Sequence, residues 1–164
     1  MIVTNRSELK KECRDVSILE AHDIIKKLED ELSNSKIPGV GLSANQIGID
    51  AKVCIIRAKN KISFVNPKIV EQYDLMEFKN EGCLSFPNKW LLTKRYNEIF
   101  VKDALHPAGF ILTGINAVIA QHEIDHLYGK TMFEYEIQRP RVNDKCWCGS
   151  DKKYKKCHMK KIIE

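Results

Sequence analysis

The chain has 164 residues, 43% of them hydrophobic and 30% charged, which is typical of a globular protein with one sizeable core and room for a small appendage. No segment approaches the roughly 18 to 20 uninterrupted apolar residues of a membrane helix. The first residues, MIVTNRSELKKE, also lack the apolar run of a secretory signal. We therefore expect a cytoplasmic protein with one main domain.

The positive charge is concentrated at the C-terminal end. Residues 138–164 hold nine Lys or Arg against three acidic residues, a formal charge of +6, so residues 1–137 are close to neutral at −1. Three of the six cysteines also crowd into this segment, and in a reducing compartment such crowding favours metal ligation over disulfides. We expect residues 138–164 to form a small separate unit. Its charge suits an acidic partner such as RNA, although a merely solvated lysine-rich end also explains it.

In chain order, the first predicted element is an amphipathic helix from about 18 to 33. Ser17 and Glu20 fit a capping box at its start, and apolar residues follow at helical spacing: Ile18, Ile25, Leu28 and Leu32. A glycine-bearing segment, 38–48, precedes the apolar run 53–56, which is typical of a buried strand. Further strands are expected at 62–65, 69–73, 90–93 and 99–103. A second helix is predicted over 113–128, ended by Gly129.

The second helix carries the sequence His122-Glu-Ile-Asp-His126. Two histidines four residues apart project from one face and can bind one metal ion, with Glu123 beside it, although an ordinary helix also produces this spacing by chance. A catalytic metal usually takes three protein ligands. Cys83 is the best candidate for the third, but a free cysteine is more often a small buried hydrophobic residue, so the residues alone leave this open.

Three segments, taken together and in this order, resemble the signature motifs of the peptide deformylases. They are GVGLSANQ at 39–46, EGCLS at 81–85 and QHEIDH at 121–126, and the likeness extends over about residues 1–137. The resemblance implies an α+β fold in which the metal-binding helix packs in the concavity of antiparallel β-sheets. It implies hydrolysis of the N-formyl group from the formyl-methionine of nascent proteins, with release of formate. Family members commonly use Fe(II), although zinc, nickel or cobalt can occupy the site.

The same resemblance implies roles for individual residues. Glu123 would act as general base and then as general acid. The side-chain amide of Gln46 and the backbone N–H of Leu84 would stabilise the charge that develops on the formyl oxygen. The backbone around Val40 and Gly41 would pair with the extended peptide. The metal ligands would be Cys83, His122 and His126. The methionine pocket would be lined by Val40, Ile115, Val118 and Ile119. The last three residues are equally well explained as helix core.

The sequence departs from the family pattern at two positions, one within the first motif and one outside the motifs. Ser43 stands where alanine is usual. Trp90 aligns with an arginine that contacts substrate in the family, so we expect Arg95 to take over part of that contact.

The C-terminal segment resembles the SEC-C motif, which is also found at the end of the bacterial protein-translocation ATPase. Its ligands would be Cys146, Cys148, Cys157 and His158, and three thiolates with one imidazole suit a closed tetrahedral zinc site. A 27-residue segment buries too little apolar surface to fold alone, so zinc would supply its stability. A lysine-rich zinc-bound segment would contact the ribosome or RNA, and no membrane partner is expected.

Two other functions compete with deformylation. A zinc endopeptidase shares the His-Glu-x-x-His arrangement, but it normally takes its third ligand from downstream of the helix, whereas Cys83 lies upstream. An inactive adaptor would bind partners through the C-terminal segment, but every expected catalytic residue is present.

Overall fold

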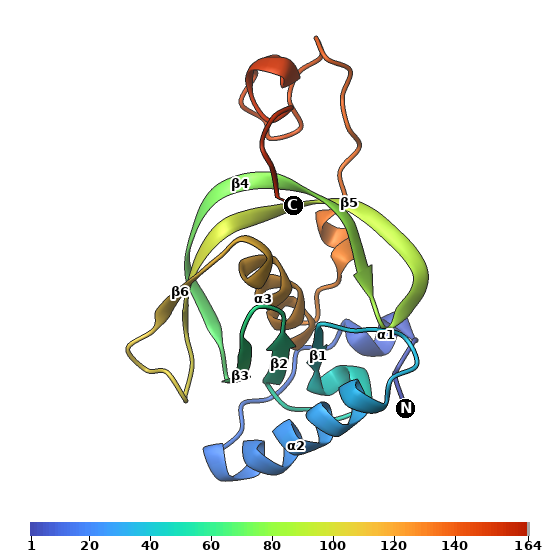
Figure 1. Ribbon diagram of the computed structural model, residues 1–164, viewed down its shortest axis with the longest axis vertical. Helices are drawn as coiled ribbons and strands as arrows, with labels where there is room; N and C mark the ends of the chain where they lie inside the picture. Colours follow the sequence, from blue (N-terminus) through green and yellow to red (C-terminus); the bar gives the residue numbers. More distant parts are fainter. Residues whose placement is uncertain (164) are drawn as a thin grey trace.

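The computed structural model describes residues 1–163 and contains two mainly antiparallel sheets arranged around one central helix, α3 (Figure 1). The smaller sheet has the order β1-β2-β3, and the larger has the order β6-β5-β4-β7. The helices are α1 (Arg6–Leu9), α2 (Ile18–Asn34) and α3 (Gly114–Leu127), and the strands are β1 (Gly41–Ser43), β2 (Val53–Arg57), β3 (Lys61–Val65), β4 (Lys68–Cys83), β5 (Phe86–Lys102), β6 (Phe110–Thr113) and β7 (Ile162–Ile163). The expected α+β fold is confirmed. Within residues 1–163, no helix is long and apolar enough to cross a membrane.

The smaller sheet is sandwiched between α2 and α3. One buried cluster packs the sheet against α3, and a second packs its opposite face against α2. The hydroxyl of Ser17 accepts a hydrogen bond from the backbone N–H of Glu20, which confirms the predicted helix start. Ala21, Ile24, Leu28 and Leu32 form the buried face of α2, whereas Ile18, which the spacing assigned to that face, is 53% exposed.

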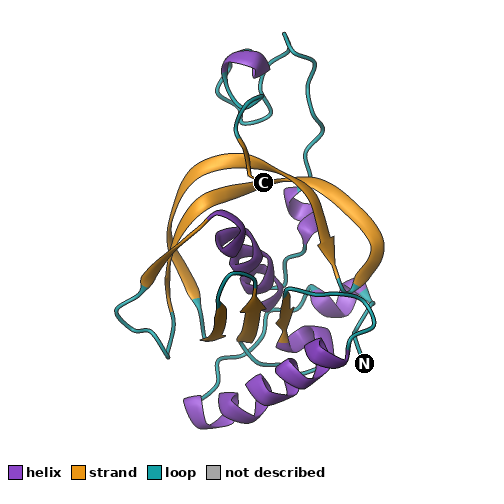
Figure 2. Ribbon diagram, viewed as in Figure 1, coloured by secondary structure: helices purple, strands orange, loops and turns teal. Residues whose placement is uncertain are grey.

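Strands β4 and β5 form one long curved ribbon that arches over α3 (Figure 2). The sequence predicted three short strands within it. Register shifts bend the pairing near Phe78, Glu81 and Cys83, and such bulges curve a strand and break its simple alternation of polar and apolar residues. The last shift lies at Cys83, where the chain turns back into β5.

Helix α3 is buried on nearly all sides, because the sheets surround it. Gly129 follows its end with a φ of 70°, and a Cβ there would lie 2.5 Å from the carbonyl oxygen of Lys10. The predicted termination of the helix by this glycine is confirmed.

The C-terminal segment packs on the convex side of the ribbon (Figure 1). Strand β7 pairs with β4 in parallel, with Ile162 opposite Glu77. The fully buried carboxylate of Glu77 accepts hydrogen bonds from three side chains of the segment: Arg139, Trp147 and Tyr154. The segment is therefore held against the sheet at several points along its length.

Candidate active site

Three potential metal ligands converge at the end of β4 and on α3. The Nε2 atoms of His122 and His126 lie 3.2 Å apart, and the Sγ atom of Cys83 lies 3.3 Å from His126 Nε2. Around a tetrahedral ion with bonds of about 2.0 to 2.3 Å, neighbouring ligand atoms are about 3.3 to 3.6 Å apart. The three side chains that the sequence singled out therefore fit one ion.

Burial and charge set the protonation of the two histidines. Burial and the neighbouring His122 hold the pKa of His126 well below its ordinary value, so its ring is neutral, the form that binds metals. Burial also lowers the pKa of His122, but its proximity to Cys83 and Glu81 outweighs this and raises the pKa well above its ordinary value. The His122 ring thus contacts both the sulfur of Cys83 and the carboxylate of Glu81.

Glu81 orients His122 from behind. Its carboxylate accepts a hydrogen bond of 2.7 Å from His122 Nδ1, which leaves Nε2 facing the other ligands. The same carboxylate accepts bonds of 2.6 and 2.9 Å from Arg95. Burial raises the pKa of Glu81, but Arg95 and His122 together hold it well below its usual range. Glu81 was not predicted as a site residue, because its contacts with His122 and Arg95 arise only in the folded chain.

The expected contact of Arg95 with substrate is wrong. Its side chain is 2% exposed and pairs with Glu81 and Asp125. A buried guanidinium is stable only when it is paired, and these two acids satisfy it. Trp90, in contrast, is 69% exposed and lines the cavity described below.

Gln46 is fixed beside the ligand cluster. Its side-chain NH₂ group donates to Ser85 Oγ at 3.0 Å and lies 3.4 Å from Cys83 Sγ, and its oxygen accepts from the backbone N–H of Ser43. The amide therefore presents its N–H groups towards the site. Leu84, which follows Cys83, lines the same cavity.

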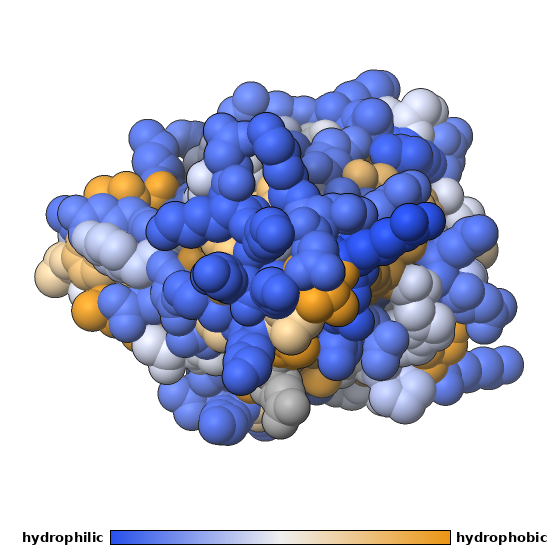
Figure 3. Space-filling model, turned by 90° about the horizontal axis from the view of Figure 1, so that it is seen from above, coloured by the Kyte–Doolittle hydropathy of each residue, from blue (hydrophilic) through white to orange (hydrophobic). Residues whose placement is uncertain are grey.

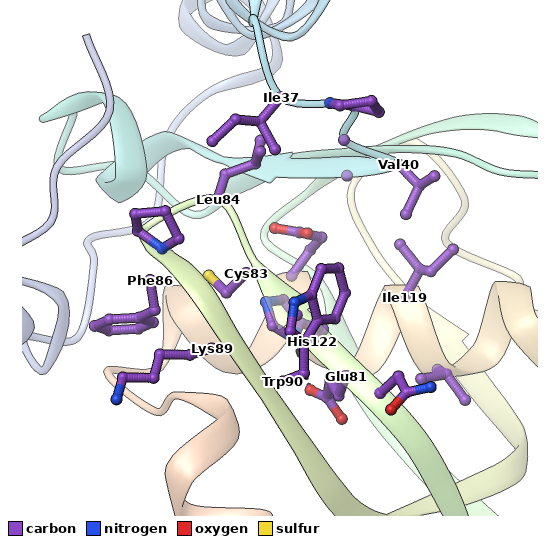
Figure 4. Close-up of a pocket in the computed structure, with 18 of the residues that line it drawn as sticks. Ile37, Val40, Glu81, Cys83, Leu84, Phe86, Lys89, Trp90, Ile119 and His122 are labelled. Carbon is purple, nitrogen blue, oxygen red and sulfur yellow. Dashed lines mark hydrogen bonds and ion pairs between the residues drawn. The ribbon is translucent and has the colours of Figure 1, made fainter.

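A cavity of about 420 Å³ opens onto these groups (Figure 4), within the range of small-ligand sites. Ten of the residues that the family resemblance assigned to deformylation line it: Val40, Gly41, Gln46, Cys83, Leu84, Ile115, Val118, Ile119, His122 and Glu123. His126, the remaining predicted ligand of this metal, is fully buried beside His122 and Cys83. Burial raises the pKa of Glu123, while His122 and Ser43 oppose the shift. Phe86 and Lys89, from the start of β5, complete the rim and were not foreseen, because nothing in their local sequence distinguishes them from ordinary strand residues.

A second cluster of potential ligands lies in the C-terminal segment. His158 Nδ1 is 3.3 Å from the sulfur of Cys146 and 3.2 Å from that of Cys157, and Cys148 lies 3.6 Å from Cys157. All four ligand atoms are within 4.8 Å of one another. His158 Nε2 lies 2.9 Å from the carbonyl oxygen of Leu75 and can donate to it, which leaves Nδ1 for the metal. The arrangement fits a closed tetrahedral site.

Comparison with known proteins identifies the family. The sequence model of the polypeptide deformylases matches residues 1–141. The chain belongs to the peptide deformylase family. The peptide deformylase of Aquifex aeolicus is 34% identical over 139 residues, 77% of this chain and 80% of that protein, and that of Karelsulcia muelleri is 32% identical over 145 residues, 82% of this chain and 76% of that protein. The SEC-C motif matches residues 143–160.

Solved deformylase structures share the fold. The Thermotoga maritima enzyme aligns with a TM-score of 0.73 at 27% identity, covering 84% of this chain and 97% of that one. The Plasmodium falciparum enzyme aligns with a TM-score of 0.72 at 31% identity, covering 84% and 87%. The protein is thus a metallo-hydrolase that removes the N-formyl group from nascent peptides, and the endopeptidase alternative is set aside.

Proposed function

We propose that Cys83, His122 and His126 hold the catalytic divalent metal of this deformylase, and that the metal is Fe(II), with zinc, nickel or cobalt able to replace it. The observation that carries the proposal is the convergence of the three ligand atoms at one end of a cavity that Glu123 also lines. One thiolate and two imidazoles suit each of these ions. Three ligands would leave a position open for chemistry.

The residues around that position have separate tasks. When bound, the metal supplies a hydroxide nucleophile near neutral pH and polarises the formyl carbonyl. Glu123 takes a proton from the attacking water and delivers it to the leaving amine, a role that its raised pKa supports. The amide of Gln46 and the backbone N–H of Leu84 stabilise the negative charge on the formyl oxygen, at about 3 to 4 kcal/mol per donor. Glu81 holds His122 in place.

Strand β1 offers the substrate an edge to pair with. It lies at the end of its sheet, with β2 on one side only, so the backbone of Val40 and Gly41 can pair with an extended peptide. The methionine side chain would then enter the apolar end of the cavity, lined by Ile115, Val118 and Ile119. This pairing would place the formyl carbon beside Glu123.

Metal content and formate release, measured on the same samples, test the ligand set. Cys83→Ala, His122→Ala and His126→Ala should each lose one equivalent of metal together with activity. Cys13→Ala is the matched control, because Cys13 is a buried free cysteine away from both clusters. A ligand variant that keeps its full metal content would refute the assignment.

We also propose that residues 138–164 form a zinc-binding unit held by Cys146, Cys148, Cys157 and His158, separate from a catalytic unit of residues 1–137. The two family matches, at residues 1–141 and 143–160, support a division within a few residues of this point. Hydrogen bonds with Ser150 lower the pKa of Cys148 to about 6 although burial opposes the shift, which favours the thiolate that binds zinc.

The lysine-rich surface of this unit would contact ribosomal RNA in the cytoplasm, where formylated chains emerge. The face seen in Figure 3, viewed from above the C-terminal segment, is mostly hydrophilic, and Lys155 and Lys156 are exposed on this segment. Co-sedimentation with ribosomes should weaken in Lys155→Glu/Lys156→Glu and at higher salt. The control is Lys26→Glu/Lys27→Glu, which reverses the charge of two exposed lysines on α2. Equal binding by the two double variants would refute the contact.

A further inference from the structure

Ser43 contacts the carboxylate of Glu123. It is fully buried at the end of β1. Its Oγ atom lies 2.6 Å from Oε2 of Glu123 and 2.8 Å from the backbone carbonyl oxygen of the same residue. Both neighbours of this hydroxyl therefore belong to Glu123, on α3, 80 positions away in the sequence.

The other carboxylate oxygen faces Gly41. A Cβ atom built on Gly41 would lie 2.5 Å from Glu123 Oε1, closer than any real contact. Gly41 and Ser43 are two residues apart on one strand, so both face α3, while Leu42 between them is buried in the cluster on the α2 side. The carboxylate is therefore enclosed by β1, with Oε2 against a hydroxyl donor and Oε1 against bare backbone.

The two oxygens also differ in their access to the cavity. Gly41 and Glu123 line it, whereas Ser43 is not among the described residues that do. Ser43 therefore lies behind the cavity lining and would act on a bound peptide through Glu123. The terminal torsion of a glutamate is broad, so a carboxylate without such a donor samples several orientations. A hydrogen bond from a hydroxyl to a carboxylate is short and strong. Such a bond restricts the range of orientations that the Glu123 carboxylate samples.

We propose that Ser43 is a positioning residue for deformylation: its hydroxyl holds Oε2 of Glu123, so that Oε1, facing Gly41 and the bound peptide, exchanges the proton. The inference rests on the proposed role of Glu123 as general base. It divides the work between two chemically equivalent atoms, one that anchors the side chain and one that reacts. The hydroxyl of Ser43 therefore acts on the catalytic base itself.

The first test compares two variants that each remove one buried atom from the same place. Ser43→Ala should lower kcat for a formyl-Met-Ala-Ser peptide about tenfold, the lower end of what a hydrogen bond to a charged group provides. KM and metal content should stay within about twofold, because neither substrate nor ligands touch the hydroxyl. Cys54, the fully buried partner of Ser43 on β2, serves as the control. Cys54→Ala should leave kcat within about twofold.

A double-mutant cycle separates positioning from general packing. Glu123→Asp keeps a carboxylate but withdraws it from Ser43 by one methylene. The double variant Ser43→Ala/Glu123→Asp should then have a kcat within about twofold of that of Glu123→Asp alone. An equal loss in both backgrounds, or a Ser43→Ala enzyme with wild-type kcat, would overturn the inference. Wild-type kcat in Glu123→Asp and Glu123→Gln would instead overturn the proposed role of Glu123, so the two failures are distinguishable.

Discussion

Replacing Glu81 by glutamine removes one charge from the most deeply buried ion pair of the site. Glu81 and Arg95 are 3% and 2% exposed, and two hydrogen bonds of 2.6 and 2.9 Å join them. Removing one partner of a buried pair typically costs about 3 to 5 kcal/mol, because the other charge is left without compensation. Asp125 still pairs with Arg95, so we expect the lower end, about 3 kcal/mol. The weakened support of His122 should also lower metal affinity about 10- to 100-fold.

Urea unfolding of the metal-free protein measures the first effect, and competition with a chelator measures the second. Glu71→Gln is the control, because Glu71 is an exposed acid on the same strand, where substitutions usually change stability by less than about 0.5 kcal/mol. A Glu81→Gln protein that matched the Glu71→Gln protein in both measurements would refute the role of Glu81.

Three other substitutions test separate contacts. Gly41→Ala should lower kcat at least about 100-fold, because its Cβ would displace the Glu123 carboxylate; formate release checks this, and a wild-type rate would contradict it. Cys148→Ser should remove one zinc per chain by elemental analysis while formate release stays within about twofold; unchanged zinc content would exclude Cys148 as a ligand. Glu77→Ala leaves the donors of Trp147 and Tyr154 without their acceptor, which should destabilise the packing of the segment by about 1 to 3 kcal/mol for each donor. Trypsin should therefore cleave within 138–164 faster, and unchanged cleavage would contradict the anchoring.

Helices α2 and α3 were predictable because their signals are local, whereas the one-turn helix α1 was not predicted. Ser17 with Glu20 marks the start of α2, and Gly129 follows the end of α3. The long ribbon was not predictable, because its bulges interrupt the alternating pattern and because charged side chains lie inside it. Glu77 and Glu81 are buried only because each meets donors from distant segments, and sequence spacing carries no information about such pairs.

The site residues, likewise, were predictable only where their signal is local. The histidine pair follows from helical spacing alone, whereas Cys83 is 43 positions from His126 and was assigned only through the family resemblance. The prediction for Arg95 failed because its pairing with Glu81 depends on the register of β4 and β5. The contact between Ser43 and Glu123 was likewise invisible until β1 and α3 were placed side by side.

The most direct test of the account is formate release from a formyl-Met-Ala-Ser peptide by anaerobically purified protein loaded with Fe(II) or nickel, measured beside Glu123→Gln. We expect release by the wild type and loss of release in the variant at equal metal content, because the variant lacks only the carboxylate proposed to transfer the proton. A metal-loaded wild type that released no formate would contradict deformylase activity, and equal release by both proteins would contradict the role of Glu123.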